Sequence, residues 1–233
     1  MCSNYQPVTS ADRLLAFFGV VRAEDEPPLE VQPEVWPLGM APFIRRAHDG
    51  SGNRLLQTGH FGLVPSFAKE LAFGRRAYNA RAETVASLPS FKQAWASGQR
   101  CIVPAEAVYE PCYDSGRAVR WIIRKPGGVP MGIAGIYRRW RSPEGSEHWT
   151  FAMLTVNATG HPVYERMHRP GEEKRMVLIL APADYDRWLQ CSPAEAASFF
   201  RPWAGALEAA PAPLPPRARI PRGPLDGEQG KLL

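Results

Sequence analysis

The sequence has few cysteines and no long apolar segment, and both absences narrow what the protein can be. Its 233 residues include four cysteines, too few and too far apart for the disulfide framework of a small secreted domain. None has the spacing of a zinc or redox motif, so we expect no metal and no cofactor. No apolar run can span a bilayer, and the first residues lack the order of a secretion signal. We therefore expect a cytoplasmic monomer without a membrane partner.

The excess of basic residues is small. Lysine and arginine number 28 against 23 acidic residues, which gives a formal charge of +5. Such a charge is compatible with a polyanion partner such as nucleic acid, but many ordinary proteins carry it too. Charge alone therefore does not identify a partner.

Hydrophobic residues make up 45% of the chain, enough for a core of ordinary size. Residues 1–208 are expected to form one domain, and the proline- and alanine-rich residues 209–233 a disordered tail. Short apolar segments separated by turn residues predict an α+β domain dominated by antiparallel strands. The expected strands cover residues 43–46, 55–56, 78–84, 101–109, 120–124, 131–137, 149–156 and 176–180.

Three helices are expected from apolar residues at helical spacing, around residues 14–18, 91–95 and 183–189. Asp12 or Thr9 is expected to cap the first of them. A fourth helix begins at Ser192, which is followed by proline and, three residues on, by Glu195. That order of residues indicates a capping box.

Cys2 is distinguished by its position. Removal of Met1 would leave an α-amine and a thiol on one residue. The amine, with a pKa of about 8, is partly neutral at pH 7 and can condense with an aldehyde. The thiol could then close a five-membered ring, or it could act as a nucleophile in acyl transfer. Position alone equally allows a terminus with no function.

Three other segments carry polar groups that could serve a site. In a strand, Asn79, Arg81 and Glu83 share one face, either as a solvent-facing edge or as a site floor in which the carboxylate holds a phosphate-binding arginine. Glu110 ends an apolar strand, where partial burial could suit a general acid/base; a surface strand end is the alternative. His168 precedes a Pro-Gly turn, either as a proton carrier or as a solvated loop residue.

Taken together, these segments resemble the SOS response-associated peptidase family of abasic-site processing proteins. The resemblance is carried by Met1-Cys2, the Asn-Ala-Arg-Ala-Glu-Thr segment from Asn79, the stretch up to Glu110, and His168 followed by Arg175-Met176. It extends from residue 2 to about residue 190. It implies a single α+β domain around a curved or barrel-like, mostly antiparallel β core with flanking helices.

The resemblance also implies a function. Cys2 would attack the aldehyde of an abasic site in single-stranded DNA and form a thiazolidine crosslink, in the DNA damage (SOS) response. Asn79 would hold the N-terminal residue, Glu110 would act as general acid/base, and His168 would assist ring opening. The family's peptidase name would reflect self-processing by the same thiol, and a lyase activity at the same aldehyde is possible chemistry. The protein would act in the cytoplasm, associated with the nucleoid when bound to DNA.

DNA contacts are implied for four further residues: Arg81 at a phosphate, Phe61 and Phe67 stacked on bases, and Asn4 beside the N-terminus. The sequence departs from the family at Ser3-Asn4, where Gly-Arg is usual, and in the longer loop after His168. Two other functions stay open. One is a cysteine peptidase that acts on proteins through Cys2, and the other is a noncatalytic single-stranded DNA-binding module.

Overall fold

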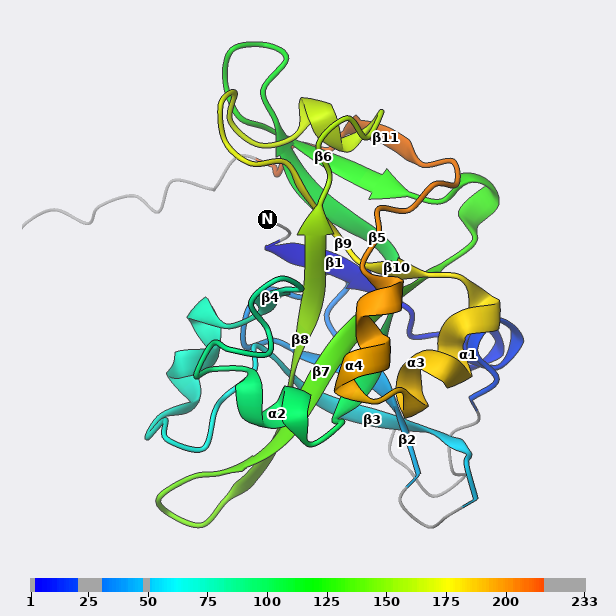
Figure 1. Ribbon diagram of the computed structural model, residues 1–233. Coiled ribbons are helices and arrows are strands. Elements are labelled where there is room, and N and C mark those ends of the chain that lie inside the picture. Colours follow the sequence, from blue (N-terminus) through cyan, green and yellow to red (C-terminus); the bar gives the residue numbers. More distant parts are fainter. Residues whose placement is uncertain (1–2, 21–30, 48–50, 216–233) are drawn as a thin grey trace, which may run out of the picture.

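The computed structural model describes residues 3–20, 31–47 and 51–215 (Figure 1). Within these residues the strands join in one mostly antiparallel sheet. The strands are β1 (Asn4–Pro7), β2 (Met40–Arg46), β3 (Arg54–Phe61), β4 (Asn79–Arg81), β5 (Arg100–Cys112), β6 (Val119–Arg124), β7 (Met131–Arg141), β8 (Glu147–Asn157), β9 (Arg175–Val177), β10 (Ile179–Leu180) and β11 (Glu208–Pro211). The α-helices are α1 (Ala11–Phe18), α2 (Lys92–Ala96), α3 (Tyr185–Gln190) and α4 (Pro193–Ala196).

Five strands of the sheet form a ring. β7 pairs with β8, β8 with β3, β3 with β2, β2 with β5, and β5 again with β7. The contact between β3 and β8 is parallel, and this contact and the one between β2 and β5 each consist of two residue pairs. The predicted α+β class and the curved, mostly antiparallel core are confirmed.

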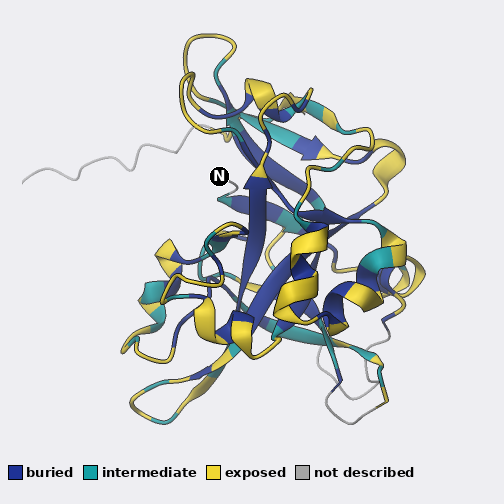
Figure 2. Ribbon diagram, in the orientation of Figure 1, coloured by how far each residue is buried: buried dark blue, intermediate teal, exposed yellow. Residues whose placement is uncertain are grey.

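Aromatic side chains fill the inside of this ring. Phe43 and Phe61 each pack against Phe151, with ring centroids 5.2 and 5.6 Å apart. All three are fully buried, and the inner strands are the most buried part of the molecule (Figure 2). Alternation of apolar residues along each strand puts these rings on one face, where burial of each stabilises the fold by roughly 1.5–3 kcal/mol.

Local signals in the sequence place the helices well, with one error at a cap. Ser192 and Glu195 form the predicted capping box at the start of α4. α1 is capped by Ser10, whose hydroxyl accepts from the Arg13 amide at 3.5 Å, and not by Asp12 or Thr9. The prediction was wrong because Ser10 has the extended backbone that aims its hydroxyl at the free amides of the first turn.

Several predicted strands extend further in the structure, such as β3, which covers Arg54–Phe61 where 55–56 was expected, and others are shorter or divided. The strand expected over residues 78–84 ends at Arg81, because the chain turns and the Thr84 amide donates to the Arg81 carbonyl at 3.1 Å. The strand expected over 176–180 splits: β9 pairs with β8, and β10 pairs with β7. β11 lies at the start of the expected tail and pairs with β6, so regular structure extends to Pro211.

Among the described residues, no helix has the length and apolar character needed to cross a membrane.

Candidate active site

A buried carboxylate and a buried imidazole lie in contact near the C-terminal end of β5. Glu110 and His168 are 2% and 6% exposed, and Nε2 of His168 lies 3.1 Å from Oε2 of Glu110. Burial of both groups strengthens their interaction and keeps bulk water from competing for their protons. The geometry suits transfer of a proton to or from a bound substrate.

The backbone at His168 holds the ring toward β5. His168 has φ +62°, a left-handed conformation that is uncommon for residues other than glycine. Its amide donates to the Pro111 carbonyl at 2.8 Å, directly after Glu110. Nδ1 of His168 is buried and has no hydrogen-bond partner among the described residues.

The described N-terminal strand leads to the same place. Cys2 lies outside the described residues, and β1 begins two residues later at Asn4. Asn4 pairs with Tyr109, the neighbour of Glu110, in the antiparallel register of β1 and β5. The strand register therefore places Asn4, the first residue of β1, at the end of β5 that carries the Glu110–His168 pair.

Asn79 and Arg81 lie on another strand. They belong to β4, which runs parallel to β8 with Asn79 opposite Met153. Arg81 donates to Glu173 at 2.8 Å, and Glu173 lies in the loop that begins at His168. The loop that begins at His168 therefore contacts predicted residues on two strands. His168 contacts Glu110 on β5, and Glu173 contacts Arg81 on β4.

Glu83 does not hold Arg81, as the site-floor interpretation of this segment requires. Its carboxylate binds both terminal nitrogens of Arg175, at 3.2 and 2.9 Å. Arg175 is 2% exposed and also donates to the Thr155 carbonyl at 2.7 Å. The predicted contact between Glu83 and Arg81 was wrong because β4 ends at Arg81, so the face alternation of a strand no longer applies at Glu83.

Asn4 is not available to DNA. It is 2% exposed, and its amide donates to Oε2 of Glu34 at 3.0 Å. Arg120 donates to the same oxygen at 2.5 Å and stacks on the Tyr109 ring at 3.4 Å. The predicted DNA contact at Asn4 is therefore corrected: this residue fastens β1 inside the molecule.

The Glu34 carboxylate should make stability depend on pH. Burial raises its pKa, but hydrogen bonds from Arg120, Tyr109 and Asn4 outweigh burial and leave it below the usual value. When folding lowers the pKa of a carboxyl group, its charged form stabilises the folded state at pH values above the pKa that the group has in the unfolded chain. This stabilisation is lost as the pH falls through the pKa of the group in the folded state.

We expect Glu34→Gln to lower the free energy of unfolding at neutral pH and to flatten its decline between about pH 5 and pH 3. Urea unfolding of both proteins across this range measures the difference. Parallel pH profiles for the variant and the original chain would contradict the expected contribution of Glu34.

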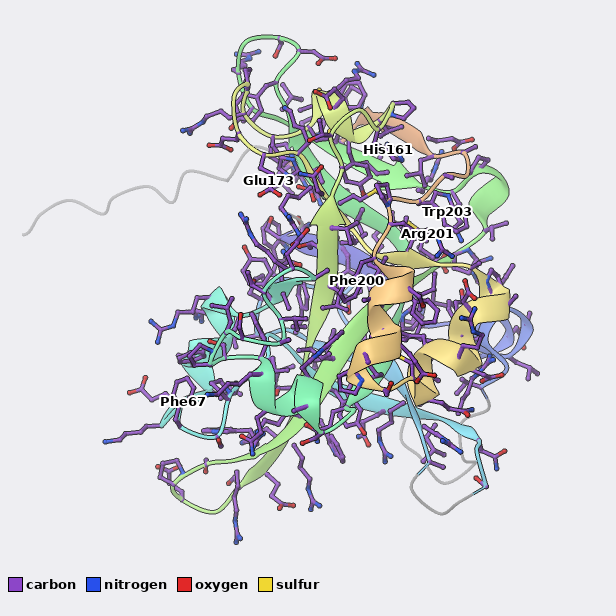
Figure 3. All side chains as sticks on the ribbon, in the orientation of Figure 1. Phe67, His161, Glu173, Phe200, Arg201 and Trp203 are labelled. Atoms are coloured by element: carbon purple, nitrogen blue, oxygen red, sulfur yellow. The ribbon has the colours of Figure 1, made fainter. Side chains whose placement is uncertain are left out.

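The two predicted stacking residues have opposite environments. Phe61 is fully buried against Tyr5, Tyr78 and Phe151, so the prediction that it stacks on bases is wrong. Alternating strand positions face inward and outward, and the tertiary structure puts Phe61 on the inside. Phe67 is 57% exposed and lies well apart from Glu173 in Figure 3, and its ring packs against Phe73 at a centroid distance of 5.5 Å.

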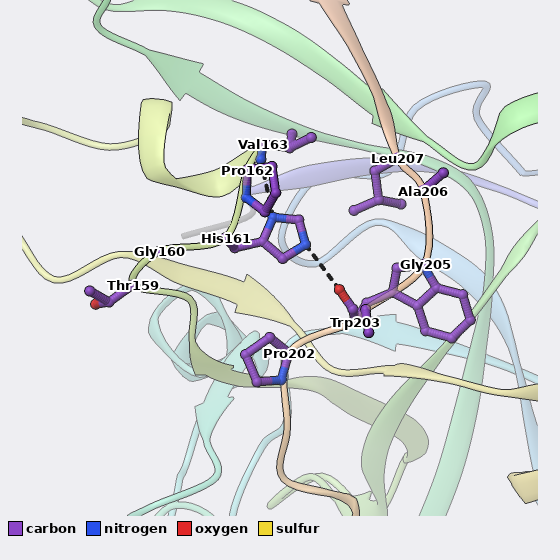
Figure 4. Close-up of a pocket in the computed structure, with 11 residues that line it drawn as sticks. Thr159, Gly160, His161, Pro162, Val163, Pro202, Trp203, Gly205, Ala206 and Leu207 are labelled. Carbon is purple, nitrogen blue, oxygen red and sulfur yellow. Dashed lines mark hydrogen bonds between the residues drawn. The ribbon is translucent and has the colours of Figure 1, made fainter.

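A surface hollow elsewhere is lined by residues 159–163 and 202–207 (Figure 4). Nδ1 of His161 accepts from the amides of Val163 and Tyr164, at 3.2 and 3.3 Å, and Nε2 lies 3.0 Å from the Trp203 carbonyl. Both ring nitrogens are occupied by backbone groups, so His161 ties the C-terminal segment to this loop. In the described part of the chain, no group of three His, Cys, Asp or Glu side chains is arranged to hold a metal ion.

Sequence reasoning missed four residues that shape the site. Glu34 and Arg120 fix β1 and lie 86 positions apart in sequence, so no local pattern marks their contact. Arg175 was recognised as part of a motif but not as the partner of Glu83. Lys174 lies in the loop after His168, where only the unusual loop length signals a special role.

The described residues thus form an α+β domain in which a buried carboxylate–imidazole pair lies beside the N-terminal strand β1. The model of the SOS response associated peptidase (SRAP) family matches residues 1–213. The chain therefore belongs to that family.

Relatives of known name agree with this assignment. The chain is 29% identical over 194 residues to abasic site processing protein YoqW of Bacillus subtilis (strain 168), covering 81% of this chain and 80% of the relative. It is 29% identical over 131 residues to abasic site processing protein HMCES of Gallus gallus, covering 47% and 39% of the two chains. A crystal structure of a Bordetella bronchiseptica protein, 37% identical, superposes with a TM-score of 0.82 over 91% of this chain and 100% of that one.

Proposed function

We propose that this protein processes abasic sites in single-stranded DNA by covalent capture through Cys2, after removal of Met1. The observation that carries the proposal is the buried Glu110–His168 contact at 3.1 Å, next to the strand that starts two residues after Cys2. Family membership and the names of the relatives support DNA with abasic sites as the substrate.

The chemistry balances without a cofactor. An abasic sugar is mostly a closed hemiacetal, so one group must take the hydroxyl proton at C1′ and another must give a proton to the ring oxygen as it opens. The Cys2 amine then adds to the aldehyde and the adduct loses water to give an imine. The Cys2 thiol adds to the imine carbon, its proton passes to nitrogen, and a thiazolidine results.

The described residues have suitable chemistry for these steps. The Glu110–His168 pair supplies a proton acceptor and a donor in a buried setting. Asn79 would hold the N-terminal residue, and Arg81, 47% exposed, would bind a phosphate beside the lesion. Its ion pair with Glu173 lies at the surface, where such pairs are weak and a phosphate can replace the carboxylate. Peptidase activity would be limited to self-processing, lyase activity would use the same aldehyde, and the setting would be the SOS response.

The test mixes the protein with an oligonucleotide that carries one abasic site, and with a matched oligonucleotide that carries none. We expect a heat-stable shifted band on a denaturing gel only with the abasic strand. Intact mass should equal the chain without Met1 plus the DNA minus one water. Absence of a band from protein that has lost Met1 would overturn the proposal, and cleavage of added peptides would instead favour a peptidase.

Phe67 gives a further prediction about DNA contacts. We expect Phe67→Ala to weaken binding of undamaged single-stranded DNA by about 1–3 kcal/mol, because the exposed ring can stack on a base. Fluorescence anisotropy with a labelled oligonucleotide measures the change. Phe17→Ala, which removes an aromatic ring that is 37% exposed on α1, is the matched control and should bind normally. Equal DNA affinities for the two variants would contradict a role for Phe67 in DNA binding.

A further inference from the structure

The ammonium group of Lys174 donates hydrogen bonds to three consecutive backbone carbonyl groups. Nζ lies 2.8 Å from the Met167 oxygen, 3.4 Å from the His168 oxygen and 3.4 Å from the Arg169 oxygen. Carbonyl groups that converge in this way repel one another unless a cation or several donors satisfy them. Lys174 therefore stabilises one particular turn of the backbone, centred on His168.

That turn is the unusual feature of the His168 backbone. With φ +62°, His168 has a left-handed conformation that is strained for a residue with a side chain. The surroundings must hold the residue there, because the chain would otherwise relax. The Pro111 carbonyl restrains His168 on its amide side, and Lys174 restrains it on its carbonyl side.

Lys174 is itself anchored to the sheet. Its carbonyl accepts from the Ala158 amide at 2.8 Å. The preceding residue, Glu173, binds Arg175 at 2.6 Å and Arg81 at 2.8 Å. The backbone at one end of the Lys174 side chain is thus fixed to β8 and β9, and the ammonium at the other end fixes the backbone of His168.

We propose that Lys174 is a positioning residue, which holds the left-handed backbone of His168 so that Nε2 reaches Glu110. Its effect on abasic-site capture rests on the function proposed above; its effect on the backbone of His168 does not. Lys174 has no contact with substrate in this role. It acts through the three carbonyl groups and the imidazole that they orient.

The backbone arm of the test uses amide hydrogen exchange and needs no DNA. Lys174→Met keeps the length of the side chain and removes the cation, so we expect the His168 amide to exchange about tenfold faster or more. Lys174→Arg keeps a cation with several donors and should restore part of the protection. Lys92→Met, at an exposed lysine of α2, is the control and should leave it unchanged. Unchanged exchange in folded Lys174→Met would overturn the proposal.

The activity arm asks whether Lys174 acts through the acid/base pair. We expect Lys174→Met to slow capture about 10- to 100-fold, with binding of undamaged DNA within about twofold of normal. Added to Glu110→Gln, it should cause little further loss, because both changes disable the same pair. A full additional loss would overturn the proposed route through His168. If the unchanged protein forms no crosslink, the proposed function fails, and hydrogen exchange still decides the role of Lys174.

Discussion

Replacement of Cys2 by alanine is expected to abolish the heat-stable crosslink to abasic DNA. Alanine at position 2 still allows Met1 to be removed and still leaves an α-amine, so an imine can form. Without the thiol no thiazolidine ring can close, and the imine hydrolyses or is lost on heating. The same sample treated with borohydride should give a band, because reduction traps the imine as a stable amine.

The control for this experiment is Cys191→Ala. Cys191 lies at the end of α3, where its thiol donates to the Trp188 carbonyl at 3.2 Å, and burial raises its pKa. A thiol held in this way is a poor nucleophile, so the variant should crosslink like the unchanged chain. A heat-stable band from Cys2→Ala, at normal yield, would show that another residue makes the bond.

Replacement of Glu110 by glutamine is expected to slow capture by roughly 10²- to 10⁴-fold, the usual range for loss of a general acid/base. Glutamine has nearly the same shape and keeps an oxygen near His168, but it cannot exchange a proton with the substrate. Single-turnover gel assays with excess protein measure the rate. The thermal midpoint of the variant shows whether the fold is kept.

Glu106→Gln is the matched control, because Glu106 lies four positions earlier on the same strand and binds Arg13 at 2.7 and 2.6 Å. We expect its capture rate to stay within about threefold of normal, since surface ion pairs contribute little. His168→Ala should resemble Glu110→Gln, and the double variant should be little worse than either, because paired residues are not additive. Equal rates for Glu110→Gln and Glu106→Gln would exclude an acid/base role for Glu110.

The structure changes how two predicted DNA contacts are understood. Phe61 fills the aromatic core, and Asn4 fastens β1 to Glu34, so both residues support the site from inside. Phe67 and Arg81 remain as exposed groups with suitable chemistry for a strand of DNA. The structure therefore leaves fewer residues for direct contact with DNA than the sequence resemblance implies.

The sequence by itself determined the local structure and the identity of the chemical groups. It predicted the helix cap at Ser192 and the short apolar strands. It also contained the motif residues, which are Cys2, Asn79, Glu110 and His168. These signals come from residues a few positions apart, whose preferences act on their own backbone. The extents of strands were less well predicted, as at Arg81, where the chain turns and the Thr84 amide donates to the Arg81 carbonyl.

Only the tertiary structure decided which of these groups meet. Glu110 and His168 are 58 positions apart, and Glu83 and Arg175 are 92 apart. Their contacts depend on the register of β1, β5, β8 and β9 and on a left-handed residue in a loop. A one-residue change of register would turn every side chain of a strand to the other face, and these contacts form only when strands far apart in the chain have paired.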